Sequence, residues 1–285
     1  MPLDYDKLID FKVEGLVHRY GPKDTMLYAL GVGLGEDPLD ERQLAFVYEK
    51  ELKALPTMAA VLAYPHAWLE GAKAGIDRVR QLHGEQGIRI HKPIPPAGEL
   101  IGSSAVTRIV DKGKDKGALV YSERKVHDRA SGDLIFTATA TSFCRADGGF
   151  GGPSGPAKPI PAIPDREPDA ACELRTLPQQ ALIYRLSGDM NRLHADPATG
   201  RAAGFPGPIL HGLCTFGVAG HALLRTLCDY DPARLAAMDV RFSAPVFPGE
   251  TILTEMWRED GRVLFRSSVP AREVVVLNNG VAEVR

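Results

Sequence analysis

The sequence predicts an α+β fold in two parts, each built from antiparallel strands, with a sheet that wraps a helix. Three observations lead to this prediction. Residues 148–168, GGFGGPSGPAKPIPAIPDREP, are rich in proline and glycine and cannot continue a helix or a central strand, so they are expected to form an extended linker. Strand-like runs joined by turns occur on both sides of it, and a long helical stripe lies in the second part. The predicted domains are therefore residues 1–147 and 169–285, joined by residues 148–168.

The strand-like runs form one predicted hairpin in each part. In the first part, residues 117–145 contain two such runs with a turn at Ser131-Gly132-Asp133. In the second part, residues 251–269 repeat the pattern around Asp260-Gly261, a dipeptide that strongly favours a hairpin turn. Both parts therefore contain neighbouring antiparallel strands.

A short internal similarity precedes each hairpin. Residues 89–101, RIHKPIPPAGELI, and residues 241–252, RFSAPVFPGETI, align at Pro93 and Pro245 and again at their Gly-Glu pairs. Each segment predicts a strand, a bend at proline, a turn and another strand. The similarity suggests that one unit was duplicated, although a match this short also arises by chance.

One long buried helix is predicted between residues 213 and 227. Its apolar positions follow a helical period, and small residues between them permit close packing. The apolar positions are Leu213, Phe216, Leu223, Leu224 and Leu227, and the small residues are Gly217, Ala219 and Gly220.

Composition limits the classes of function. The formal net charge of −2 and pI near 6.5 provide no basic surface for nucleic acid or an anionic membrane. The four cysteines are scattered, and the N-terminal residues lack the features of a signal peptide. We therefore expect a soluble cytoplasmic protein with no nucleic-acid or membrane partner. The segment 31–35, GVGLG, lacks the spacing of a dinucleotide-binding loop, and no GxSxG motif indicates an α/β-hydrolase.

The candidate site begins in residues 184–197, YRLSGDMNRLHADP, where Asp189, Asn191 and His194 lie close together. A carboxylate and an imidazole in irregular backbone can converge on one water, remove a proton from it and deliver a proton elsewhere. Asn191 can orient a partner through its amide. The alternative is structural: Asp189 and Asn191 build local turns and His194 caps a neighbouring element.

A second candidate element is the start of the predicted helix, where Ile209, Leu210 and His211 lead into Gly212. Free N–H groups at a helix N-terminus can stabilise negative charge on a thioester oxygen, and a glycine lets that oxygen approach. The alternative is a glycine tolerated for packing. A metal site formed by Asp189, His194, His211 and His221 is not favoured, because neither an HxH nor an HExxH spacing is present.

These motifs together resemble the MaoC-like family of (R)-specific 2-enoyl-CoA hydratases, and in particular the two-domain type fused into eukaryotic peroxisomal multifunctional enzymes. The resemblance rests on Tyr-x-Leu-Ser-Gly-Asp-x-Asn-x-x-His followed by PILHGLCTFG, and it covers nearly the whole chain. The supporting segments are YALGVG (28–33), LPT (55–57), HGEQ (83–86), GGFGG (148–152) and RFSAPVFPG (241–249).

The resemblance implies a double hotdog fold, in which only the second unit is catalytic. It implies reversible hydration of a trans-2-enoyl-CoA to a (3R)-3-hydroxyacyl-CoA, with no metal or other cofactor, since coenzyme A is part of the substrate. Carried over by position, Asp189 and His194 hold the water, Asn191 supports them, and the Gly212 amide polarises the thioester carbonyl. A homodimer is also implied.

Substrate contacts are implied at further positions. These are His83, Gly84, Lys112, Met190, Arg192, Leu193 and Phe242. Lys112 suits the phosphates of coenzyme A, although it could be an ordinary lysine in an exposed loop. His83 and Gly84 could instead belong to the start of a strand, and Phe242 to the core. The family's usual GDWNPLH is GDMNRLH here, with Met190 for tryptophan and Arg192 for proline, so acyl preference and stability could differ.

Two other functions remain open. One is a related enzyme, either a hotdog thioesterase or a dehydratase that acts on acyl-carrier-protein substrates. The other is a non-catalytic module that binds acyl-CoA. The combination of Asp189, Asn191, His194 and Gly212 speaks against the second, because a binding module has no use for an activated water.

Overall fold

The computed structural model describes residues 3–66, 68–155 and 161–285. The predicted linker at 148–168 falls partly outside these residues, since 156–160 are not described. On either side, residues 148–155 and 161–168 contain neither helix nor strand, as their prolines and glycines predict. No helix in the described part of the chain is long and apolar enough to cross a membrane.

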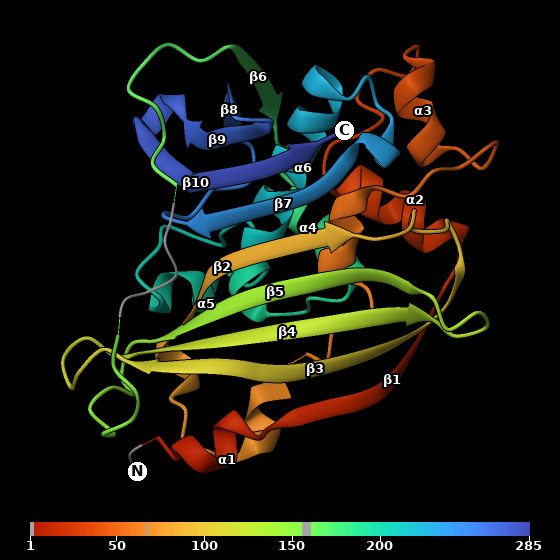
Figure 1. The fold of residues 1–285 in the computed structure, drawn as a ribbon. Helices are drawn as coiled ribbons and strands as arrows, with labels where there is room; N and C mark the ends of the chain where they lie inside the picture. The colour runs from red at the N-terminus through yellow and green to blue at the C-terminus, as the bar shows by residue number, and fades with distance from the viewer. Residues whose placement is uncertain (1–2, 67, 156–160) are drawn as a thin grey trace.

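Among the described residues, the first part contains eleven helices and strands and the second part contains twelve (Figure 1). The first part contains α1(Tyr5–Ile9), β1(Lys12–Tyr20), α2(Pro22–Gly31), α3(Glu41–Val47), η1(Pro56–Ala60), η2(Trp68–Ala72), η3(Arg78–Arg80), β2(Gln81–Ile90), β3(Gly98–Asp111), β4(Ala118–Asp128) and β5(Leu134–Cys144). The second part contains β6(Ala170–Arg175), α4(Gln180–Tyr184), η4(Arg185–Ser187), η5(Arg192–His194), α5(Pro197–Ala202), α6(Gly212–Leu227), η6(Pro232–Arg234), β7(Leu235–Phe242), β8(Thr251–Glu259), β9(Arg262–Val269), η7(Pro270–Arg272) and β10(Val274–Val284).

All ten strands form one antiparallel sheet in the order β1-β3-β4-β5-β2-β7-β10-β9-β8-β6. Numbered within each part, the strands have the same order, first-third-fourth-fifth-second, and the two second strands, β2 and β7, pair at the centre. Both predicted hairpins are present as β4–β5 and β8–β9. The shared strand order supports duplication, because an accidental sequence match would not also repeat the topology.

The pairing of β2 with β7 defines a local two-fold axis. The same sequence offset separates Pro93 from Pro245, which the internal similarity aligns, and Gly87 from Asp239, which are directly paired in the ladder. A Cβ at Gly87 would lie 2.3 Å from Oδ1 of Asp239 and 2.5 Å from Oγ1 of Thr139. Only glycine therefore permits the two units to approach so closely at the axis.

The long helix α6 confirms the predicted buried stripe. It contacts β6, β7, β8 and β10 on one side of the sheet, and most of its residues are buried. A Cβ at Gly217 would lie 2.4 Å from Cγ1 of Val32, and one at Gly220 would lie 2.3 Å from Cγ2 of Thr57. The small residues therefore permit close packing, as predicted, and the contacting residues come from the first part of the chain.

The first part contains no comparable central helix among its described residues. The short segment η1, which contacts β2 and β5, lies there instead. Three residues after η1, Ala63 has a left-handed conformation with φ of 49°, and Pro65 disfavours helical backbone at the residue before it. The two units thus share a sheet topology, which is the double hotdog arrangement implied by the resemblance, but they differ in what the sheet encloses.

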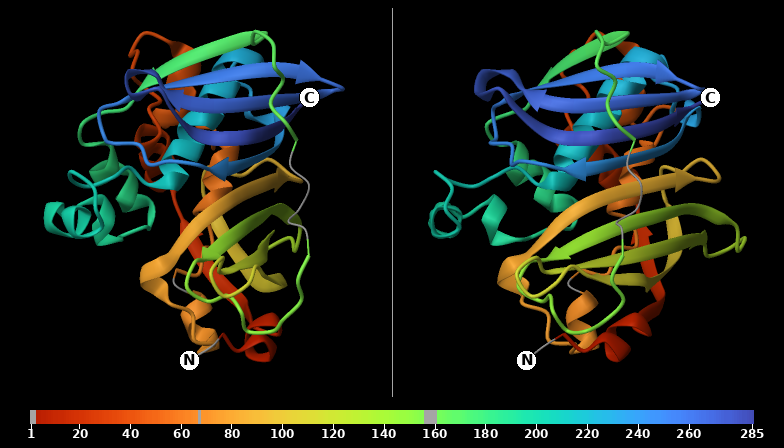
Figure 2. Two further views of the ribbon diagram at one scale, coloured as in Figure 1. Left: turned by 90° about the vertical axis from the view of Figure 1, so that its left-hand side faces the viewer. Right: turned by 60° about the vertical axis from the view of Figure 1, so that its left-hand side comes forward.

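Figure 2 shows that α6 and the segment carrying η5 and α5 lie on the same side of the sheet. That segment connects α4 to α6 and includes the predicted catalytic residues. The fold therefore places the Asp/Asn/His loop next to the N-terminus of α6.

Candidate active site

Local turns shape the loop that carries the predicted catalytic pair. Gly188, with φ of 124°, ends the turn before it. Oδ1 of Asp189 accepts a hydrogen bond from the Asn191 amide at 3.1 Å, and Oδ1 of Asn191 accepts one from the Leu193 amide at 3.0 Å. The structural interpretation is therefore correct for Oδ1 of Asp189 and for the single side-chain oxygen of Asn191, while Oδ2 of Asp189 and Nδ2 of Asn191 take no part in these turns. These bonds also hold the carboxylate beside His194.

His194 is 8% exposed, and its orientation is set by one main-chain group. Its Nδ1 lies 2.9 Å from the carbonyl oxygen of Ile209. Because a carbonyl oxygen only accepts, Nδ1 must carry the hydrogen, and Nε2 of the neutral ring is left as an acceptor. The ring can therefore take a proton at Nε2.

His211 packs directly against His194, and it is 1% exposed. The ring centroids are 3.8 Å apart with an interplanar angle of 27°. Nε2 of His211 donates to the carbonyl oxygen of Asp189 at 3.1 Å, so its Nδ1 is an acceptor, which has no hydrogen-bond partner among the described residues. One donor or acceptor atom from each of Asp189, His194 and His211 falls within 4.8 Å of the others.

Burial keeps the histidine rings of this cluster neutral near pH 7. It lowers the pKa of His194, while the charge of Asp189 acts in the opposite direction. Burial, followed by the neighbouring His194, lowers the pKa of His211 to about 4. His194 therefore has no positive charge stacked on it, and its Nε2 is available as a base.

The start of α6 forms the opposite wall of the site. Gly212 is the first helical residue, and the preceding His211 provides no side-chain cap. The N–H groups of the first helical turn have no acceptor within the helix. A Cβ at Gly212 would lie 3.2 Å from the ring of Phe242, so glycine leaves room between this amide and the aromatic ring.

The first part of the chain supplies His83 and Gly84 to the same wall. The ring of His83 lies 4.9 Å from that of Phe242, and burial lowers its pKa to about 4. Its Nε2 is buried without a partner among the described residues. The register between β2 and β5 shifts between His83 and Glu85, which makes Gly84 the irregular position. His83 thus packs on Phe242, which in turn lies against Gly212, whereas the neighbours of Gly84 are Thr141 and Phe143 of β5; the roles of His83, Gly84 and Phe242 in binding stay predictions.

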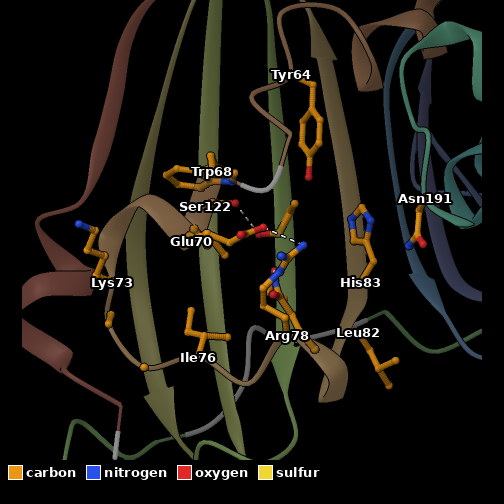
Figure 3. Close-up of a pocket in the computed structure, with 16 residues that line it drawn as sticks. Tyr64, Trp68, Glu70, Lys73, Ile76, Arg78, Leu82, His83, Ser122 and Asn191 are labelled. Atoms are coloured by element: carbon orange, nitrogen blue, oxygen red, sulfur yellow. Dashed lines mark hydrogen bonds and ion pairs between the residues drawn. The ribbon is translucent and has the colours of Figure 1, made fainter. Parts of the chain in front are cut away.

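A cavity of about 450 Å³ opens beside the site (Figure 3). Asn191 and His83 lie at one edge, and the remaining walls belong to the first part of the chain. The lining residues are Tyr64, Trp68, Leu69, Glu70, Lys73, Ala74, Gly75, Ile76, Arg78, Gln81, Leu82, His83, Ser122, Ala140, Ser142 and Asn191. No sequence motif marks the segment from Tyr64 to Arg78, because its position depends on a contact between distant residues. A Cβ at Gly188 would lie 3.1 Å from Nε2 of His66, so His66 packs against the loop that carries Asp189 and His194.

The other predicted substrate contacts lie away from this cavity. Lys112 lies in the exposed loop after β3. Met190 is 55% exposed, and Arg192 forms an exposed ion pair of 2.6 Å with Asp196. Leu193 is half-buried, and its carbonyl accepts from the Ile209 amide. None of these four lines the cavity, and their roles in binding stay predictions.

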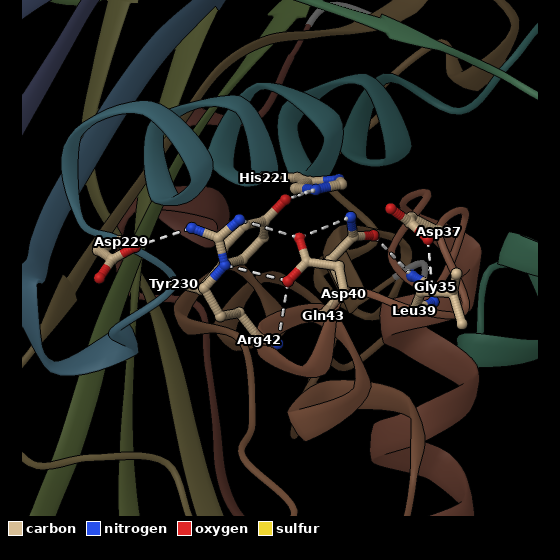
Figure 4. Close-up of polar contacts among 9 residues, drawn as sticks. All are labelled: Gly35, Asp37, Leu39, Asp40, Arg42, Gln43, His221, Asp229 and Tyr230. Atoms are coloured by element: carbon tan, nitrogen blue, oxygen red, sulfur yellow. Dashed lines mark hydrogen bonds and ion pairs between the residues drawn. The ribbon is translucent and has the colours of Figure 1, made fainter.

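The cluster of Asp189, His194 and His211 also has the spacing of a possible metal site, which the sequence did not favour. His221, the fourth residue of that alternative, lies elsewhere. Its Nδ1 lies 3.4 Å from the Val32 carbonyl oxygen and its Nε2 lies 3.2 Å from the hydroxyl of Tyr230. Figure 4 shows this ring beside a polar network that joins α3 to the residues after α6. His221 is thus a structural residue between the two parts of the chain.

Comparison with known proteins identifies both parts. Residues 18–146 match the family model described as the MFE-2 hydratase 2 N-terminal domain, and residues 159–279 match the MaoC like domain. The chain is 45% identical over 282 residues to 3-hydroxyacyl-thioester dehydratase Y of Mycobacterium tuberculosis, covering 95% of this chain and 94% of that protein. It is 39% identical over 298 residues to peroxisomal enoyl-CoA hydratase 2 of Arabidopsis thaliana, covering 98% and 95%.

Solved structures show the same architecture. A MaoC-like dehydratase from Phytophthora capsici superposes with a TM-score of 0.87 at 35% identity, covering 98% of each chain. A Mycobacterium tuberculosis protein described as having a double hotdog fold superposes with a TM-score of 0.58 at 16% identity, covering 99% of this chain and 97% of the other. The predicted double hotdog fold is confirmed.

Proposed function

Because the chain belongs to the MaoC-like hydratase 2 family, we propose that it hydrates a trans-2-enoyl-CoA to a (3R)-3-hydroxyacyl-CoA with a water held by Asp189 and His194. At the level of the family it is a carbon–oxygen lyase with enoyl-CoA hydratase 2 and 3-hydroxyacyl-thioester dehydratase activity. The stereochemistry and the roles of individual residues are the parts that we propose.

In the proposed reaction, Nε2 of His194 and the carboxylate of Asp189 bind one water between them. The oxygen of this water forms a bond to the β-carbon as a proton leaves it to the pair. The pair delivers a proton to the α-carbon, so that one water is added across the double bond and the enzyme is unchanged. The neutral state of His194, which its burial favours, is the state that this step requires, and the bond to the Ile209 carbonyl fixes Nδ1 as the nitrogen that carries the hydrogen.

Negative charge develops on the thioester oxygen while the β-carbon is attacked. The N–H of Gly212, at the start of α6, is the proposed donor to this oxygen. His211 acts as a positioning residue, since it stacks on His194 and holds the main chain of Asp189 through Nε2. Asn191 holds the loop in shape through its bond to the Leu193 amide.

The second unit is thus the proposed catalytic part, and the first unit is proposed to hold the acyl group and part of coenzyme A. The cavity of about 450 Å³, walled mainly by the first unit and open beside Asn191, supports this division. Cytoplasmic location and a homodimer stay proposals, to be checked by cell fractionation and by light scattering of the purified protein.

One observation supports this function most directly. The Nδ1–H of His194 is bonded to the Ile209 carbonyl, and the Asp189 carboxylate lies in one cluster with His194 and with His211, the residue that precedes α6. The test follows loss of the conjugated enoyl absorbance with purified protein. Product is trapped by a dehydrogenase specific for either the (3R) or the (3S) alcohol. Signal through the (3R)-specific enzyme alone is expected, and signal through the other would contradict the proposed stereochemistry.

The same assay separates the remaining alternatives. A thioesterase would release free thiol, which hydration does not. A carrier-protein dehydratase would prefer acyl-carrier-protein substrates over the matching CoA thioesters. A binding module would bind without turnover. Full activity after treatment with a chelator is expected if Asp189, His194 and His211 act without a metal, and loss restored by a divalent ion would assign that cluster to metal binding.

A further inference from the structure

The cavity beside the active site is unusually polar for one that receives a hydrocarbon chain. Its walls include Ser122 from β4, Ser142 from β5 and Gln81 from β2, together with an ion pair of 2.7 Å between Arg78 and Glu70. Lys73 adds a further positive charge at the rim. Figure 3 shows the Glu70–Arg78 pair in the middle of this view, between Lys73 on one side and His83 on the other. Such a lining suits a ligand that brings polar atoms of its own, because buried polar groups need hydrogen-bond partners.

The cavity adjoins a smaller space of about 20 Å³ that reaches Arg124. The two spaces share the walls formed by Tyr64, Trp68, Ser122 and Ala140. This volume accommodates one or two heavy atoms, since a single water needs roughly 10–15 Å³. The inner space is thus large enough for the terminal oxygens of a ligand whose chain fills the larger cavity.

Arg124 is a buried cation without an anionic partner. It is 6% exposed, and burial lowers its pKa to about 10. Within the described part of the chain, no Asp or Glu forms an ion pair with it, and its Nε has no hydrogen-bond partner. Burying a guanidinium without a counter-charge is unfavourable because the group loses its hydration. An anionic group of a ligand would offset this loss by pairing with it.

Arg124 also has a structural role that does not account for its whole side chain. Its Nη2 donates to the carbonyl oxygens of Ala59 at 2.7 Å and Ala60 at 3.0 Å, which belong to η1. The guanidinium lies 5.0 Å from the centre of the Tyr64 ring. These contacts use one end of the planar group and one of its faces. The unpartnered Nε and the missing negative charge stay unexplained by packing alone.

We propose that the acyl chain of the preferred substrate ends in a carboxylate, which Arg124 binds at the inner end of the cavity. The substrate class is then a 2-enoyl thioester with an ω-carboxyl group, instead of one with a methyl end. Lys73 at the rim favours entry of this anion. The inference rests on the proposed function, because the reactive end of the same substrate must lie beside Asp189 and His194.

The test measures binding first, with saturated acyl-CoAs that cannot react. Ligands with a carboxyl end and with a methyl end are compared at equal chain length, over a series from short to long, by calorimetry. At the best length, the ω-carboxyl ligand should bind roughly tenfold or more tightly, as expected for a charge-assisted hydrogen bond. In the Arg124→Met variant, the affinity for the ω-carboxyl ligand divided by that for the methyl-ended ligand should fall to one or below. Equal or weaker binding of the ω-carboxyl ligand at every length would overturn the inference.

Two further variants separate charge recognition from support of η1. Arg124→Lys keeps the charge and should keep part of the preference. Lys23→Met removes an exposed charge of α2, at a residue that lines neither the cavity nor the inner space, and should leave the preference unchanged. If Arg124 had a purely structural role, Arg124→Met would weaken the binding of both ligands by the same factor. The ratio of their dissociation constants would then stay as in the wild type, which would overturn the inference.

Hydration of the matching 2-enoyl-CoAs is measured alongside. If the enzyme hydrates ω-carboxyl and methyl-ended 2-enoyl-CoAs with equal affinity and rate, this inference is contradicted and the proposed function still holds. A binding preference without turnover would contradict the proposed function and leave the carboxylate site standing. The two proposals can therefore fail separately.

Discussion

The two ends of the β2–β7 junction are related by the local two-fold axis, but among the described residues only one end carries the proposed catalytic groups. At one end, His83 and Phe242 lie beside Gly212 and the Asp189–His194 pair. The sequence offset of the duplication places Leu235 and Ile90 at the corresponding positions of the other end.

A cavity of about 420 Å³ lies at that other end, and its walls are of a different kind. They are mostly apolar or proline, no Asp or Glu lines them, and the short helix that begins there starts with Pro56, which has no N–H to donate. Duplication thus preserved the geometry at both ends, whereas the acid–base and amide groups are present at one. The comparison teaches that the hotdog sheet supplies a pocket, and that a few polar residues decide whether the pocket can react.

A second difference follows from what each sheet encloses. In the second unit α6 fills the space against the sheet, whereas in the first unit the short η1 leaves room that the segment from Tyr64 to Arg78 only partly covers. One unit therefore provides a helix N-terminus, and the other provides a cavity, which we propose receives the acyl group.

The largest effect is expected when the proposed catalytic residues Asp189 and His194 are replaced, which tests whether only this end of the junction is active. Asp189→Asn and His194→Gln are each expected to lower kcat by roughly 10²–10⁴-fold, because each removes one of two groups that move the proton. CoA-thioester binding and the fold should stay intact. The control is His91→Gln at the other end, which should leave turnover unchanged. The asymmetry would be wrong if either catalytic variant stayed near wild-type activity or if the control lost as much.

The helix N-terminus can be tested by removing one N–H. Gly212→Pro deletes the proposed donor, and it suits the first helical position because His211 is extended, with φ of −59° and ψ of 135°. We expect kcat to fall by roughly 10²–10³-fold, the usual effect of losing an oxyanion donor. Gly212→Ala keeps the N–H but adds a Cβ 3.2 Å from Phe242. Equal losses in both variants would indicate steric damage instead of a lost donor.

The close approach at the two-fold axis should be required for stability. Gly87→Ala places a Cβ where Asp239 and Thr139 already lie, and it should lower the free energy of unfolding by about 1–3 kcal/mol. Gly207→Ala, where the added Cβ meets nothing within 4 Å, is the matched control. Urea denaturation of both variants measures the difference, and equal stability would argue against a tight junction.

Acid should destabilise the interface between the two parts through His221. Burial lowers the pKa of this ring to about 4, so the unfolded chain, with an ordinary value near 6.5, takes up its proton first as the pH falls. The contribution of the neutral His221 ring to the free energy of unfolding is fully present above pH 6.5. It is lost as the pH falls toward 4, and the free energy of unfolding is lower by about 2 kcal/mol at pH 5. Unfolding free energy measured against pH should fall less steeply in His221→Asn than in the wild type. An unchanged slope would exclude His221 as a contributor.

The smallest effect is expected at the exposed loop after β3. Lys112→Ala should raise KM by about fivefold with little change in kcat, because a contact with a phosphate of coenzyme A is remote from the reacting carbons. Steady-state kinetics over a range of ionic strength tests this role. A loss confined to kcat would contradict it.

Much of the fold could be predicted from short windows of sequence. The two hairpins, the buried stripe of α6 and the glycines that pack against Val32 and Thr57 follow from periodicity and turn residues. So does the loop that gathers Asp189, Asn191 and His194, because their spacing within one turn-rich segment limits how far apart they can lie. Resemblance to a family added the reaction and the role of Gly212.

Contacts between residues that are far apart in the sequence could be known only from the tertiary structure. The stacking of His211 on His194, the contact of His66 with Gly188 and the burial of Arg124 join positions separated by long stretches of chain. No local pattern marks these residues, because burial and neighbouring charges, which set their protonation and their partners, arise only when the two units pack together. The sequence by itself thus determined the elements and the catalytic motif, and packing between the units determined the state of the histidines and the shape and polarity of the cavity beside them.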